Sequence, residues 1–108
     1  MEYQKEELHR KALNIISFNE NIVKGGNAKK HKTSIFGKIL KFIFAERNWS
    51  FEDVGNFLCM TPQNINYIVN RMDEKSFNVI YVSELCRKLQ INIDFFYGLY
   101  NEIKEIEN

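Results

Sequence analysis

A single proline, Pro62, separates two stretches of this sequence that carry apolar residues at helical spacing. Proline cannot continue a helix that began before it, but it fits the first position of a new helix, where its missing N–H group would have had no partner. Thr61, directly before it, is a residue type that caps helix N-termini. The sequence therefore predicts that one helix ends before Thr61 and that another begins at Pro62.

Both helices beside this break are short. Ser50, followed three residues later by Asp53, is a variant of the capping box and predicts a helix from Ser50 to about Cys59. The next helix is predicted from Thr61 to Arg71. About three residues separate the two helices, which is the spacing of a helix-turn-helix motif.

The rest of the chain also favours helices. Amphipathic spacing predicts helices over residues 4–18, 34–47 and 92–106, and a further helix after residue 76 whose core side carries Val79, Val82, Leu85, Cys86 and Leu89. Residues 19–33 include a glycine pair and a run of basic residues, and they predict a flexible basic linker. We therefore expect an all-α protein, with a compact bundle of about five helices in residues 34–108 and an additional N-terminal helix and linker in residues 1–33.

Residues that carry catalytic or metal chemistry are few and scattered. Cys59 and Cys86 lack the CxxC spacing, and His9 and His31 lie far from both cysteines and from each other. We predict no metal site, no cofactor and no catalytic residues, and hence a protein that is not an enzyme. The apolar helical surroundings of both cysteines predict small core side chains in a reducing compartment. The first ten residues are charged and no apolar run reaches the roughly 18 residues of a membrane span, so we expect a cytoplasmic protein without a membrane partner.

The net charge of +1 is unevenly distributed along the chain. Residues 24–47 contain seven lysine or arginine side chains against Glu46 alone, whereas the last turn of the chain is acidic. Such a basic segment steers a protein toward phosphates, although a solvated lysine-rich linker would give the same pattern. Within it, Lys29, Lys30 and Lys32 are candidate contacts to a DNA backbone or minor groove.

The helix that begins at Pro62 has two chemically different faces. Its core stripe consists of Ile65, Ile68, Val69 and Met72, and its opposite side presents Gln63, Asn66, Tyr67 and Asn70, flanked by Asn64 and Arg71. Carboxamide side chains can form bidentate hydrogen bonds with adenine in the major groove, and a helix N-terminus with Thr61 can hold a phosphate. The alternative interpretation is a polar face that only contacts solvent.

The segment from Phe36 to Phe96 resembles the phage repressor and Cro-like helix-turn-helix family, also called the XRE or lambda repressor-like family. The family's Leu-Gly-Val-Ser segment resembles residues 58–61, and its later Ile-Ala-Lys-Ala-Leu-Gly-Val-Ser segment resembles residues 85–92. The resemblance implies a lambda repressor-like bundle that binds double-stranded DNA. It also implies base contacts from Gln63, Asn64 and Tyr67, to which the polar face adds Asn66, and backbone contacts from Thr61, Asn70, Arg71 and Lys75.

Two residues in or near the turn have structural roles that the resemblance implies. Gly55 stands where the family keeps a small residue so that the two helices can approach closely. Cys59 stands at the usual turn glycine, where a positive φ costs a residue with a Cβ about 1 kcal/mol.

The predicted function is a sequence-specific transcriptional regulator, a repressor that binds a palindromic operator as a homodimer with half-sites about one DNA turn apart. The weak net charge and the acidic C-terminal turn favour an alternative, in which the same fold binds a protein partner, as an antitoxin or a phage-encoded inhibitor would. A missing salt dependence of DNA binding, or no DNA binding at all, would distinguish the second function from the first.

Overall fold

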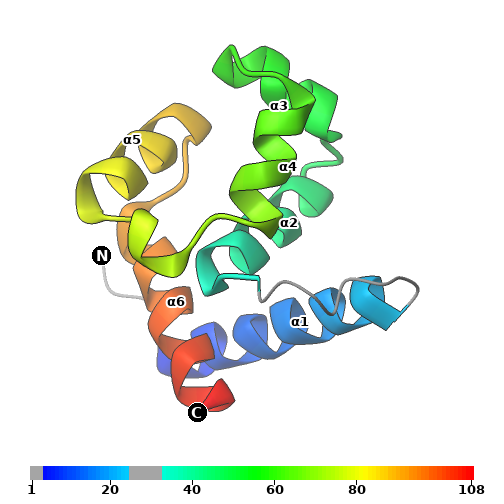
Figure 1. Ribbon diagram of the computed structural model, residues 1–108. Coiled ribbons are helices and arrows are strands. Elements are labelled where there is room, and N and C mark those ends of the chain that lie inside the picture. Colours follow the sequence, from blue (N-terminus) through cyan, green and yellow to red (C-terminus); the bar gives the residue numbers. More distant parts are fainter. Residues whose placement is uncertain (1–3, 25–32) are drawn as a thin grey trace.

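Six α-helices and one short 3₁₀-helix account for most of residues 4–24 and 33–108, which this computed structural model describes (Figure 1). In chain order they are α1 (Lys5–Lys24), α2 (Ile35–Glu46), α3 (Phe51–Leu58), α4 (Pro62–Asn70), the 3₁₀-helix η2 (Glu74–Ser76), α5 (Val79–Leu89) and α6 (Ile93–Glu107). No strand occurs within these two ranges, which confirms the predicted all-α fold.

The helix starts follow from capping residues. At five helices the side chain of the cap residue accepts a hydrogen bond from the backbone N–H three residues later, and these caps are Ser34, Ser50, Thr61, Asn78 and Asn92. The Ser50 cap is a complete capping box, because the Asp53 carboxylate also accepts the Ser50 N–H at 2.9 Å. Each such cap satisfies backbone donors that the first helical turn leaves unpaired.

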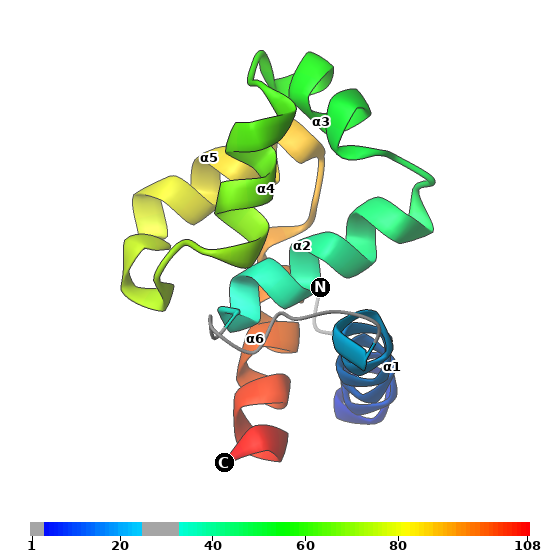
Figure 2. The ribbon, with the colours of Figure 1, turned by 45° about the vertical axis from the view of Figure 1, so that its right-hand side comes forward.

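The core forms around α2, which packs against α1, α4 and α6 (Figure 2). Ile39 and Leu40 on α2 are fully buried. The Phe36 ring stacks on Tyr100 of α6 with 4.2 Å between ring centroids, and on Phe77 with 5.0 Å. These contacts connect α2 to the last helix, α6, and to the segment before α5.

The N-terminal helix α1 packs along α6 and against α2. Ala12 and Ile15 of α1 are fully buried in the same core. Asn19 is also buried, and its side-chain N–H group donates to the carbonyl oxygens of Ile15 and Lys38, at 2.9 and 3.2 Å. Because these contacts give the end of α1 a partner on α2, the helix continues to Lys24, and the predicted linker was wrong for residues 19–24.

Two side chains predicted for the core are exposed. Val79 has 66% of its surface exposed because it is the first residue of α5, and Phe77 fills the core at that end instead. Cys59 is exposed because it lies in the turn after α3, whereas Cys86 is buried in α5 as predicted.

Candidate nucleic-acid interface

A turn of three residues, 59–61, joins α3 to α4 (Figure 1). Cys59 has φ 60° and ψ 46°, the left-handed conformation expected for the position at which the family keeps glycine. The Met60 N–H group then donates to the carbonyl oxygen of Gly55 at 2.7 Å. This bond closes the end of α3 and directs the chain into α4.

Gly55 allows this turn to lie against α3. A Cβ atom at this position would overlap the carbonyl oxygen of Met60, which is part of the backbone and cannot swing away. A small residue is therefore needed at Gly55, as predicted, although the tight contact is with the Met60 carbonyl in the turn and not between the two helices. The reason is close backbone approach, since none of the described glycines has a positive φ.

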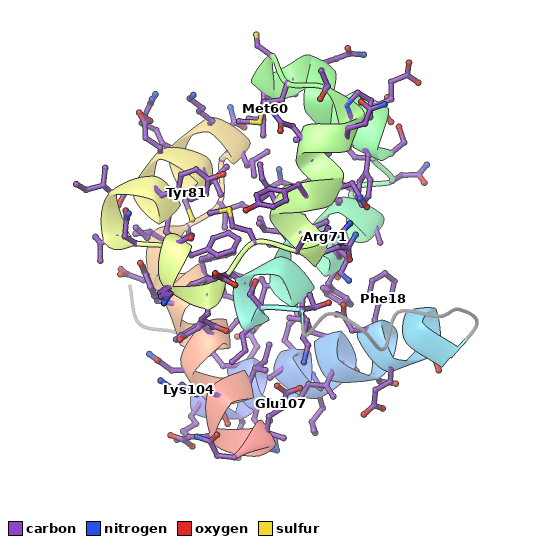
Figure 3. All side chains as sticks on the ribbon, in the orientation of Figure 1. Phe18, Met60, Arg71, Tyr81, Lys104 and Glu107 are labelled. Carbon is purple, nitrogen blue, oxygen red and sulfur yellow. The ribbon has the colours of Figure 1, made fainter. Side chains whose placement is uncertain are left out.

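The inner face of α4 is fixed in the core. Ile65, Ile68 and Val69 are buried, as the helical spacing predicts. Gly37 of α2 lies against the backbone of α4, so closely that a Cβ there would overlap the carbonyl oxygen of Val69. In Figure 3, the labelled Met60 and Arg71 mark the two ends of α4.

The outer face of α4 brings the predicted base-contacting residues together. All four side chains are exposed: Gln63, Asn64, Asn66 and Tyr67. Thr61 is exposed as well, and its hydroxyl oxygen accepts the Asn64 N–H at 3.1 Å. Arg71 and Lys75, predicted as backbone contacts, are exposed just beyond the other end of the helix.

Asn70, another predicted backbone contact, takes part in a hydrogen-bonded chain within the protein. The Lys41 Nζ atom on α2 donates to Asn70 Oδ1 at 2.7 Å, and Asn70 Nδ2 donates to Asn66 Oδ1 at 2.8 Å. Burial lowers the pKa of Lys41, and the nearby charge of Lys38 lowers it further. Nothing in the sequence pattern had indicated Lys41 as part of this face.

The described part of the basic segment is engaged in contacts within the protein. The Lys38 ammonium pairs with the Glu107 carboxylate at 2.9 Å, and the Arg47 guanidinium donates to the carbonyl oxygens of Leu89, the last residue of α5, and of Gln90, its C-cap. The predicted backbone contacts Lys29, Lys30 and Lys32 lie outside the described residues. The prediction that the basic segment binds phosphates thus gains little support from Lys38 and Arg47, because both are engaged within the protein.

Acidic and apolar groups are exposed on α3 and α5, the helices before and after α4 in the chain. Glu52 and Asp53 are exposed in the first turn of α3, and the hydrogen bonds from Ser50 hold the pKa of Asp53 below its usual value. On α5, Val79 and Ile80 are 66% and 79% exposed. Tyr81, one residue further, has its pKa raised first by burial and then by the charge of Tyr67 on α4.

Comparison of the chain with protein-family models, curated proteins and solved structures finds no match. The family resemblance therefore stays a prediction from the residues themselves. Within residues 4–24 and 33–108, no three His, Cys, Asp or Glu side chains are grouped to hold a metal ion, and no helix combines the length and apolar character needed to cross a bilayer.

Proposed function

We propose that this protein is a sequence-specific DNA-binding regulator that inserts α4 into the major groove of double-stranded DNA. The observation that carries the proposal is the combination of a short α3, a three-residue turn with left-handed Cys59, and a helix that exposes only polar or hydrogen-bonding side chains opposite its buried stripe. The major groove admits an α-helix, and the amides of Gln63 and Asn64 lie near the N-terminus of α4, where such helices reach base edges.

The proposal extends to a cytoplasmic repressor that acts as a homodimer on a palindromic operator. Two copies of α4 would then lie in successive major grooves, about 34 Å apart along the DNA. Thr61 and the N-terminus of α4 would contact one phosphate, because the first N–H groups of a helix and its dipole favour an anion.

Binding of the purified protein to DNA from around its own gene tests the proposal. Fluorescence anisotropy is measured on that duplex and on a scrambled duplex, at about 50 and 200 mM salt. A Gln63→Ala, Asn64→Ala double variant should lose at least about 30-fold in affinity for the specific duplex, if each amide contributes about 1 kcal/mol or more of base discrimination. A double variant at exposed amides on other helices, Asn14→Ala with Asn101→Ala, should bind as the wild type does.

The result that would refute the proposal is equal binding of the specific and scrambled duplexes by wild type and both variants.

One observation favours a second candidate function, a protein-interaction module on the same fold. Val79 and Ile80 expose an apolar pair at the start of α5, and Glu52 and Asp53 expose two carboxylates at the start of α3 that would repel phosphates. Absence of DNA binding by the wild type, together with loss of the protein's cellular effect in a Val79→Ser, Ile80→Ser variant, would support the second function.

A further inference from the structure

We propose that Lys41 sets the hydrogen-bonding polarity of the α4 face, so that Asn66 directs its N–H donors toward the DNA and reads an acceptor on a base edge. This inference rests on the proposed function. Lys41 is a positioning residue here, because it acts on Asn66 only through Asn70.

The three side chains form one continuous chain from the core to the exposed face. Lys41 lies on α2 and is partly buried, Asn70 at the end of α4 is partly buried, and Asn66, one turn earlier, is exposed. The two hydrogen bonds measure 2.7 Å from Lys41 Nζ to Asn70 Oδ1 and 2.8 Å from Asn70 Nδ2 to Asn66 Oδ1.

The charge of Lys41 decides which way both amides point. A side-chain amide can usually be turned by 180° with little change in shape, so its orientation must come from its partners. An ammonium group has donors only, and it therefore requires the oxygen of Asn70. The Asn70 NH₂ group is then left to face Asn66 and requires an oxygen there, so the Asn66 NH₂ group points away from the protein.

An outward NH₂ group selects among bases by their acceptors. In the major groove adenine offers N7, guanine offers N7 and O6, and thymine offers O4, whereas the cytosine edge offers a donor, N4–H₂. Asn66 is thereby less suited to the bidentate adenine contact predicted from its residue type, since its oxygen already accepts from Asn70. The hydrogen bonds described for the α4 face do not fix the side-chain amides of Gln63 and Asn64 in this way.

Asn70→Asp reverses the polarity without changing the shape of the side chain. An aspartate accepts from Lys41 and also presents an oxygen to Asn66, which must then turn its NH₂ group inward and its oxygen toward the DNA. Lys41→Met removes the anchor while keeping the length of the side chain. Asn56→Asp is the matched control, because it adds the same charge on the exposed side of α3.

The experiment measures affinities for a panel of duplexes in which each base pair of the bound half-site is substituted in turn. The base pair read by Asn66 is the one at which Asn66→Ala loses discrimination. At that pair we expect the wild type and Asn56→Asp to prefer an acceptor by about 3- to 10-fold, as for one hydrogen bond, and Asn70→Asp to lose or reverse this preference. Lys41→Met should weaken it. Effects of added charge on overall affinity cancel, because only the preference at one base pair is compared.

Retention of the wild-type preference at that pair by both Asn70→Asp and Lys41→Met would overturn the inference, and so would an Asn66→Ala variant that keeps every preference. The NMR signals of the side-chain amides, measured without DNA, distinguish failure of this inference from failure of the proposed function. Lys41→Met should shift the signals of Asn70 and Asn66 and leave that of Asn64 unchanged. If the signals respond in this way but no duplex is bound specifically, the hydrogen-bonded chain exists and both DNA proposals fail.

Discussion

Replacement of Gly55 by alanine tests whether the turn between α3 and α4 depends on close backbone approach. The added Cβ would lie well inside 3.0 Å of the Met60 carbonyl oxygen, a separation that real Cβ atoms essentially never show. That oxygen belongs to the backbone, and the turn is fixed by the bond from Met60 N–H to Gly55 and by the cap at Thr61. The turn must therefore move as a unit and shift the start of α4.

Two opposing effects set how much stability the Gly55→Ala variant should lose. Alanine in a helix interior is favoured over glycine by about 1 kcal/mol. Overpacking of a rigid site costs about 1 to 3 kcal/mol, and the backbone obstacle puts Gly55 at the upper end. The free energy of unfolding should therefore fall by about 2 kcal/mol, which corresponds to a melting temperature about 8 °C lower for a domain of this size.

Thermal unfolding followed by circular dichroism measures this shift, with Gly98→Ala as the matched control. Gly98 also lies inside a helix, but a Cβ there would meet only the end of the Leu8 side chain, at 3.0 Å. Leu8 can turn aside, so Gly98→Ala should leave the melting temperature unchanged or raise it by a few degrees. A Gly55→Ala protein that melts at or above the wild-type temperature would show that the turn is not limited by this contact.

Three further outcomes are expected from the same region. Cys59→Gly should raise the free energy of unfolding by about 1 kcal/mol, because glycine adopts φ 60° without a Cβ penalty; an unchanged melting temperature would contradict this. Thr61→Ala should lower it by about 1 kcal/mol through loss of the N-cap, whereas Thr61→Ser should not, and urea unfolding of both variants checks the difference. In the native protein a thiol reagent should modify exposed Cys59 first, because burial shields Cys86 and raises its pKa to about 11; faster modification of Cys86 would be incompatible with the structure.

Local chemistry made most of the fold predictable. Pro62 and the caps at Ser50 and Thr61 fix the ends of α3 and α4 through interactions within a few residues. The end of α1 was not predictable in this way. Residues 19–24 carry only two apolar side chains, and Asn19 among them is buried against Lys38 on α2, a contact that depends on how two helices cross.

The candidate site likewise combines features that local sequence predicts with one that depends on how the helices pack. Helical periodicity was enough to place Gln63, Asn66 and Tyr67 on one exposed face, since residues three and four apart share a side of a helix. Periodicity within α4 carries no information about Lys41, which is 29 residues distant from Asn70 in the sequence. Their contact exists because Gly37 lets α2 lie directly against the backbone of α4.

These contacts hold α4 at three points along its length. Gly55 fixes the turn before it, Gly37 fixes its middle against α2, and Lys41 fixes Asn70 at its end. A helix held in this way presents its side chains in one geometry, which favours discrimination between bases and lowers the entropy lost on binding. If α4 reads DNA as proposed, substitutions at these three points should change which bases are preferred. Removal of a lysine that contacts phosphates, as predicted for Lys75, should instead weaken binding to all DNA sequences alike. It should also reduce the slope of log affinity against log salt concentration by nearly one unit.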